Sequence, residues 1–154
     1  MSYYGCGAAN CPNNQGNIGN DSLCNCMQRV VIESPYAGKT DFDILKNEIY
    51  GEFCMRDCIV NYHETPYASH LLYTRKNVLK DKDPVQRKLG IEAGFFWREV
   101  ATKTVFYIDL GMTPGMELGI EDCEKKGNLY NVRHMTPELF EEFTAAVNAE
   151  RGSF

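Results

Sequence analysis

Strand-like and helix-like segments alternate four times along this chain, and that alternation limits the fold more than any other feature. Each strand-like segment is short, apolar and rich in β-branched or aromatic residues, and a longer segment with helical spacing of apolar residues follows it. We predict strands near 29–34, 66–72, 104–109 and 129–133. Such an alternation builds an α/β fold, a doubly wound parallel sheet with helices on both faces and right-handed crossovers.

Capping residues mark the ends of the predicted helices. A residue that can cap a helix stands directly before proline at three places, Asp83–Pro84, Thr113–Pro114 and Thr136–Pro137. We expect Asp41 to cap the first helix and Gly127 to end the third. The second predicted helix, which runs to about residue 102, carries its apolar residues on one side: Val85, Leu89, Ala93, Phe96 and Val100.

The first 28 residues differ in kind from the rest. They hold six asparagines, four glycines and a single charged residue, which is the chemistry of turns and loops. We therefore divide the chain into a flexible or loosely docked tail, 1–28, and one globular domain, 29–154. Four of the seven cysteines lie in this tail, but their spacing matches no common zinc site, so we expect unliganded thiols and no metal.

Composition excludes several classes of partner. A net charge of −5 and a pI of about 5.2 give no basic field to hold a nucleic acid polymer or an anionic membrane. The chain has no apolar run of 18 residues and no signal-peptide pattern at its start, which predicts a cytoplasmic protein. A small molecule is the expected ligand.

Ligands of doubly wound sheets bind beyond the carboxyl ends of the strands, where the strand order reverses. That rule selects Ser34, Pro35 and Tyr36 after the first strand, His70 at the end of the second, and Asp109 after the third. Each has a structural alternative, because serine also forms turns and tyrosine also packs over sheets.

The turn from Gly111 to Glu117 joins the third strand to a helix and should face the same crevice. Its backbone amides could bind a phosphate, since helix N-termini bind anions. Glu117 has two interpretations. It is a favourable charge at the start of a helix, worth about 0.3–1 kcal/mol, or it is an oriented carboxylate for attack at an anomeric carbon.

The segment GMELG at 115–119 resembles the signature of the nucleoside 2-deoxyribosyltransferase superfamily, which includes the 2′-deoxynucleoside 5′-phosphate N-glycosidases. The resemblance extends more weakly over 29–133 through VVIESPYAG, and it includes small bacterial and phage-encoded members with SPYAG, ASHLLYT and LGIEAG segments. It implies a flavodoxin-like fold with strand order 2-1-3-4, a location in the cytoplasm of the host if the gene is phage-encoded, and a homodimer or larger homo-oligomer.

The resemblance also implies residue roles. Glu117 matches the glutamate that attacks C1′ of the deoxyribose, and Asp109 most nearly matches the acidic residue that assists departure of the base. Phe96 stands where these enzymes carry a helix aspartate, and Glu92, one turn earlier, could replace it. The remaining residues expected to contact substrate are Ser34, Pro35, Tyr36, His70, Thr113, Gly115 and Met116.

Two functions follow from these residues, beside a third alternative, a structural or adaptor domain in which Glu117 is only a charge at the start of a helix. One is cleavage of the bond between base and sugar in a deoxynucleoside or its 5′-monophosphate, by an N-glycosidase or deoxyribosyltransferase that needs no cofactor. The other is binding without catalysis, in which the same crevice senses or sequesters a nucleotide. The intact GMELG favours the enzyme, and the missing helix aspartate favours the binder.

Overall fold

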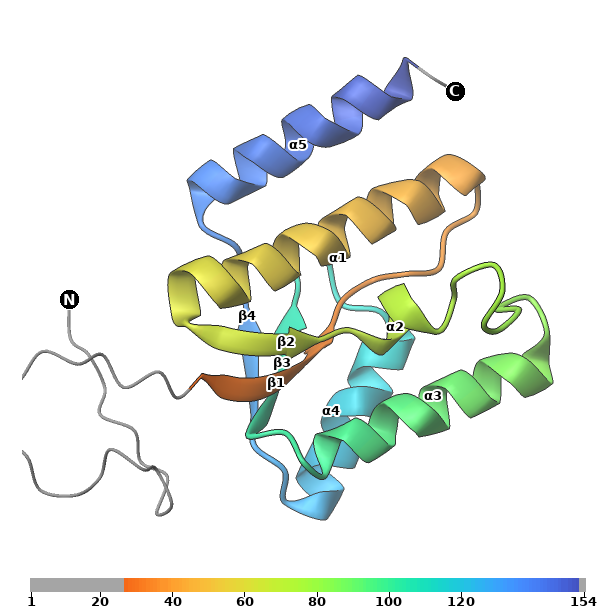
Figure 1. Ribbon diagram of the computed structural model, residues 1–154, viewed down its shortest axis with the longest axis vertical. Helices are drawn as coiled ribbons and strands as arrows, with labels where there is room; N and C mark the ends of the chain where they lie inside the picture. Colours follow the sequence, from red (N-terminus) through yellow and green to blue (C-terminus); the bar gives the residue numbers. More distant parts are fainter. Residues whose placement is uncertain (1–26, 153–154) are drawn as a thin grey trace, which may run out of the picture.

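The computed structural model describes residues 27–152, which form a four-stranded parallel sheet with helices on both faces (Figure 1). The strands are β1 (Gln28–Glu33), β2 (Glu64–Tyr67), β3 (Lys103–Tyr107) and β4 (Tyr130–Arg133). The helices are α1 (Asp41–Tyr62), α2 (Ser69–Leu72), α3 (Pro84–Arg98), α4 (Pro114–Lys126) and α5 (Pro137–Arg151). The predicted tail lies almost wholly outside the described residues.

The strand order is β2-β1-β3-β4, as predicted, and all three pairings are parallel. The flavodoxin-like arrangement is therefore confirmed. Because β1 lies between β2 and β3, the chain leaves β1 toward one edge of the sheet and later continues toward the other. Ile32 of β1 pairs with Val105 of β3, and both are fully buried. The direction in which strands are added to the sheet therefore reverses between β1 and β3, and a ligand site is expected beyond the carboxyl ends of these two strands.

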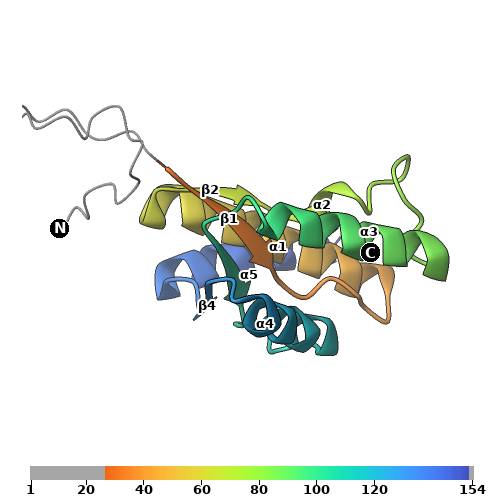
Figure 2. The same ribbon diagram turned by 90° about the horizontal axis from the view of Figure 1, so that it is seen from below.

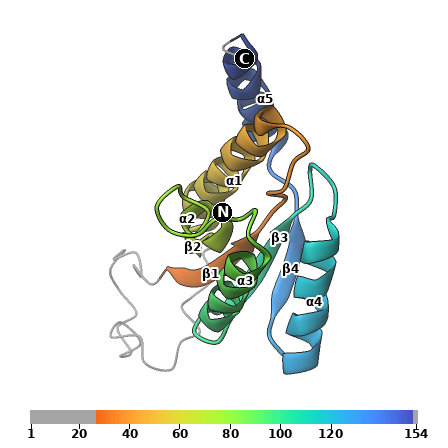
Figure 3. The ribbon, with the colours of Figure 1, turned by 90° about the vertical axis from the view of Figure 1, so that its right-hand side faces the viewer.

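Helices α1 and α5 cover one face of the sheet, and α3 and α4 cover the other (Figures 1 and 3). The larger apolar core lies on the first face, where Ile32, Tyr50, Val105 and Phe143 pack together. A smaller core on the second face centres on Phe106, Met116 and Cys123. Seen from below, α3 and α4 flank the carboxyl end of β1 (Figure 2).

The second strand is shorter than predicted. It ends at Tyr67, and the residues expected to complete it form the short helix α2. The apolar pair Leu71–Leu72 fits either structure, because a short apolar run does not distinguish strand from helix. In the structure Leu71 is buried, whereas Leu72 is 50% exposed.

Local capping chemistry was predicted correctly at three helices. The side chains of Asp83, Thr113 and Thr136 accept hydrogen bonds from backbone amides in the first turns of α3, α4 and α5. Gly127 ends α4 with a positive φ of 69°. The cap of α1 is Thr40, not Asp41, because Thr40 and Asp43 form a reciprocal capping box.

The apolar stripe of α3 faces solvent, and the buried side of this helix is formed by Gly94 and Arg98. Phe96 is 70% exposed and Val85 is 69% exposed. The helix approaches α2 so closely at Gly94 that a Cβ there would lie 2.7 Å from Ser69 Oγ. This close contact fixes the rotation of α3 and turns its apolar residues outward.

A buried polar network ties α1 to the sheet. The Tyr107 hydroxyl donates to Asp57 at 2.6 Å, and Arg133 donates to the Tyr107 hydroxyl at 3.2 Å and to Glu64 at 2.9 Å. Lys103 pairs with the same Glu64 at 2.7 Å. These contacts satisfy the buried charges of strands β2, β3 and β4.

Candidate functional site

A cavity of about 430 Å³ opens at the carboxyl end of β1, on the face covered by α3 and α4. Its walls come from four separate segments: the end of β1 with the loop that follows, the region from α2 to Thr74, the segment from Asp81 through α3 to Phe95, and the first turns of α4. The cavity therefore lies where the strand order predicts a ligand site, and its volume is within the range of about 300–1,000 Å³ found for small-molecule pockets.

Two predicted residues meet in one wall. Ser34 Oγ and His70 Nε2 share a hydrogen bond of 2.8 Å, although 36 residues separate them in sequence. Burial lowers the pKa of His70 to about 4, so the imidazole is neutral at pH 7. Its other ring nitrogen, Nδ1, has no hydrogen-bond partner among residues 27–152. The pair offers a hydroxyl and a neutral imidazole to a polar ligand group.

The loop after β1 is held in one conformation. The Asn47 side chain donates to the carbonyls of Tyr36 and Ala37 at 3.0 and 3.1 Å. Gly38 leaves no room for a side chain, because a Cβ there would lie 2.4 Å from Asp43 Cβ. The Tyr36 ring consequently stands in the cavity wall, edge-on to His70 with 6.2 Å between ring centroids.

The opposite wall is the start of α4. Thr113 caps the helix by accepting from the Met116 amide, and Gly115 adds backbone but no side chain. A Cβ at Gly115 would meet only Thr113 Oγ1, at 3.9 Å, so the space beside it is open. Met116 lines the cavity from beneath while packing against Phe106 and Cys123.

Sequence reasoning missed three charged residues of the lining, Glu33, Asp81 and Arg87. Arg87, in the first turns of α3, pairs with Asp81 at 2.8 Å, and both side chains are partly exposed at the cavity. Glu33, the last residue of β1, accepts from buried Arg98 at 2.7 Å. Asp81 and Arg87 lie six residues apart across the start of α3, whereas Glu33 and Arg98 meet only after α3 docks on the sheet.

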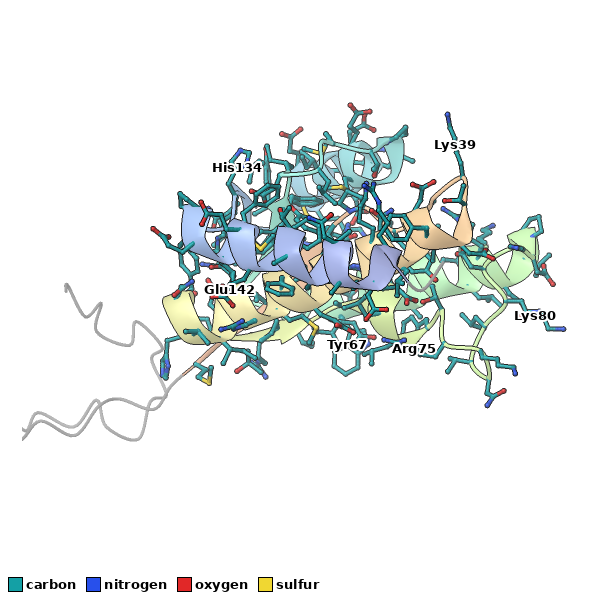
Figure 4. All side chains as sticks on the ribbon, turned by 90° about the horizontal axis from the view of Figure 1, so that it is seen from above. Lys39, Tyr67, Arg75, Lys80, His134 and Glu142 are labelled. Atoms are coloured by element: carbon teal, nitrogen blue, oxygen red, sulfur yellow. The ribbon has the colours of Figure 1, made fainter. Side chains whose placement is uncertain are left out.

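Several predicted residues are placed elsewhere. Asp109 does not line the cavity: it accepts from the Tyr50 hydroxyl at 2.6 Å and from the Met135 amide at 3.2 Å, and it lies 3.3 Å from His134. These contacts join the segment after β3 to α1 and to the loop before α5, which carries His134 (Figure 4).

Glu117, Glu92 and Pro35 also lie outside the lining. Glu117 is exposed, and its carboxylate forms no hydrogen bond or ion pair with the rest of residues 27–152. Glu92 is ion-paired with Lys88 at 3.8 Å on the outer surface of α3. Of the ten predicted site residues, the cavity gathers six: Ser34, Tyr36, His70, Thr113, Gly115 and Met116.

No group of three or more His, Cys, Asp or Glu side chains in the described part of the chain is arranged to hold a metal ion. The three cysteines there, Cys54, Cys58 and Cys123, are buried free thiols. Burial raises the pKa of Cys58 to about 12, so this thiol is protonated at pH 7. Between residues 27 and 152, no helix is both long and apolar enough to cross a membrane.

The sequence profile of a family described as "Domain of unknown function (DUF7768)" matches residues 28–133. The chain belongs to this family. The matched segment begins at the first residue of β1 and ends at the last residue of β4, so the family unit includes the entire sheet and every wall of the cavity, while α5 follows it. No curated protein matches the chain.

Proposed function

We propose that this DUF7768 protein binds a nucleoside or nucleotide in the cavity at the carboxyl end of β1. The observation that carries this proposal is the combination of that position with the chemistry of the walls. Aromatic and aliphatic side chains, including Tyr36, Tyr73 and Ile91, surround a small number of fixed polar groups. A planar base binds against aromatic and aliphatic side chains, and a sugar needs hydrogen-bonding groups such as Ser34 and His70.

Binding without catalysis is the function that this geometry favours. Glycoside cleavage through a covalent intermediate needs a carboxylate nucleophile and an acid on opposite sides of the scissile bond. The Asp109 oxygens are already engaged by Tyr50 and Met135, and Glu117 lies outside the cavity lining. The two carboxylates that line the cavity, Glu33 and Asp81, are ion-paired with Arg98 and Arg87, so the lining offers groups for recognition and no free carboxylate pair.

Calorimetric titration tests the proposal. The full chain is titrated with the four deoxynucleosides and with their 5′-monophosphates, and released base is measured in the same samples. We expect at least one of these ligands to bind with one site per chain and to remain intact. The absence of binding throughout the series at millimolar ligand would contradict the proposal.

A second function, N-glycosidase or deoxyribosyltransferase activity, is favoured by the position of Glu117. Its neighbours on both sides, Met116 and Leu118, line the cavity, and its carboxylate has no partner in the described chain that would hold it away. Rotation of this exposed side chain would bring a carboxylate toward a bound sugar, as the resemblance to the deoxyribosyltransferases implies.

Glu117→Gln tests this second function. If Glu117 is the nucleophile, base release from a bound deoxynucleoside or monophosphate falls by roughly 10³-fold or more, while the ligand Kd changes by only a few fold. Glu121→Gln is the matched control, because Glu121 is also exposed on α4, one turn further along. Base release that is absent from the wild type, or that survives Glu117→Gln, would exclude this mechanism.

A further inference from the structure

We propose that the cavity selects a phosphorylated ligand, and that Arg87 binds the phosphate after releasing Asp81. This inference rests on the proposed function and names its ligand class. Among the side chains that line the cavity, Arg87 carries the positive charge at pH 7, since His70 is neutral. A guanidinium forms paired hydrogen bonds with phosphate oxygens, which a neutral hydroxyl group cannot match.

The Arg87–Asp81 pair is suited to exchange. The two side chains are 47% and 30% exposed, and partly exposed ion pairs of this kind contribute only about 0–1 kcal/mol. A phosphate monoester carries up to two negative charges at pH 7 and can replace one carboxylate at the guanidinium. Asp81 therefore fills the position of the phosphate in the free protein without holding it strongly.

Arg87 is also held in place by its surroundings. Asp83 caps α3 through the Val85 amide at 2.9 Å, and the Gln86 side chain accepts from the Lys80 amide at 2.8 Å. These bonds fix the segment before α3 against the helix that carries Arg87. A segment that is already ordered loses less conformational entropy when a ligand binds to it.

The charge of the neighbouring chain supports an anionic ligand. Residues 75–88 contain six basic side chains and two acidic ones, for a net charge of +4, although the whole chain carries −5. Arg75 and Lys88 pair with Glu52 and Glu92 outside this segment, whereas Lys80 extends from it at the end of the molecule where Lys39 also projects (Figure 4). A local positive field in an acidic protein steers anions toward the cavity.

Arg87→Gln tests this inference by calorimetry with a deoxynucleoside and its 5′-monophosphate. In the wild type we expect the monophosphate to bind at least about tenfold more tightly than the nucleoside. Arg87→Gln should remove that difference while leaving nucleoside binding within about twofold. Asp81→Asn should strengthen monophosphate binding, because the competing carboxylate is gone.

Arg56→Gln is the matched control, since Arg56 is also partly exposed and ion-paired, with Glu142 at 2.7 Å between α1 and α5. It should leave both affinities unchanged. Equal binding of the two ligands by the wild type, or an equal loss of both in Arg87→Gln, would overturn the phosphate site while leaving the proposed function intact. Failure of both ligands to bind would overturn the proposed function itself.

A separate observation, the outward-facing stripe of α3, points to a second copy of this chain as its partner. The stripe contains Val85, Leu89, Ala93 and Phe96, and Val100 follows them in the turn after α3. The four larger side chains are 53–70% exposed, and exposed apolar patches of this kind mark interfaces.

The order of these residues is self-complementary. Ala93 stands at the centre, and valine stands at both ends, so an antiparallel copy places Leu89 against Phe96 of the partner subunit and Val85 against its Val100. A two-fold axis near Ala93 generates this contact, and the small alanine lets the helices approach closely. Lys88 and Glu99 lie on one flank at opposite ends of the stripe, so the same pairing brings opposite charges together.

Light scattering after gel filtration tests the α3 interface. We expect the wild type to be a dimer and Phe96→Glu to be a monomer with an unchanged circular dichroism spectrum, because Phe96 contributes little to the monomer core. Val60→Glu is the control, since Val60 is 69% exposed on α1, and it should remain dimeric. A monomeric wild type at about 100 μM, or a Phe96→Glu variant that remains dimeric, would overturn this interface.

Discussion

Replacing Arg98 with alanine is expected to lower the free energy of unfolding by about 3–5 kcal/mol, the typical cost of breaking a buried ion pair by removing one partner. The Arg98 side chain is 1% exposed. It donates to Glu33 at 2.7 Å, to Asp122 at 3.1 Å and to the Gly119 carbonyl at 3.3 Å. One guanidinium thus joins β1, α3 and α4, and alanine would leave the Glu33 carboxylate unpaired and Asp122 with Lys126 as its remaining partner at 2.9 Å.

The pH dependence of this effect has a definite sign. Burial raises the pKa of Glu33 while Arg98 opposes that rise, so the pKa should rise further in Arg98→Ala. A carboxyl group with a raised pKa is buried most easily in its protonated form. The variant should therefore lose stability, relative to wild type, as the pH rises above the ordinary pKa of a glutamate, about 4.3.

Urea unfolding at several pH values measures both effects. Arg56→Ala is the control, because the Arg56–Glu142 pair is more than half exposed and should contribute about 0–1 kcal/mol. If Arg98→Ala cost no more than Arg56→Ala, the buried cluster would not be what fixes α3 and α4 around the cavity.

Gly115→Leu is expected to weaken nucleotide binding by about a hundredfold or more, which corresponds to about 2.8 kcal/mol. Gly115 lines the cavity, and a side chain there extends into open space beside Thr113. Leucine would occupy volume that the ligand needs. Because leucine has a higher helix propensity than glycine, the melting temperature should not fall.

Calorimetric titration and thermal unfolding check this prediction together. Ala149→Leu is the control, since Ala149 is exposed near the end of α5 and lies outside the cavity. It should bind ligand like the wild type. Unchanged affinity in Gly115→Leu would show that the ligand occupies another surface.

The parts of the fold that the sequence predicted depend on local chemistry. Thr113 before Pro114 and Gly127 after α4 define the ends of that helix whatever it packs against. Alternation of strands and helices likewise leads to a parallel sheet, because short connections and right-handed crossovers leave few other topologies. Ser34 and His70 were selected by the same topological rule, and their hydrogen bond confirms that they lie together.

The sequence predictions fail where contacts between residues far apart in the sequence determine the orientation of a helix or a side chain. The apolar period of α3 identified one face of the helix but could not show whether that face meets the sheet or solvent. The rotation of α3 depends on the close contact of Gly94 with Ser69 and on the ion pairs of Arg98 with Glu33 and Asp122. The partners in these ion pairs are 65 and 24 residues apart in sequence. Asp109 was placed correctly at a strand end, but Tyr50, 59 residues away, determines its direction.

A crystal structure of the full chain with a bound deoxynucleoside 5′-monophosphate would locate the ligand directly. We expect its density in the cavity at the carboxyl end of β1, with the phosphate at Arg87, Asp81 displaced, and the sugar or base within hydrogen-bond distance of Ser34 or His70. An empty cavity in crystals grown at saturating ligand, or ligand density on another surface with the Arg87–Asp81 pair intact, would contradict a nucleotide site in this cavity.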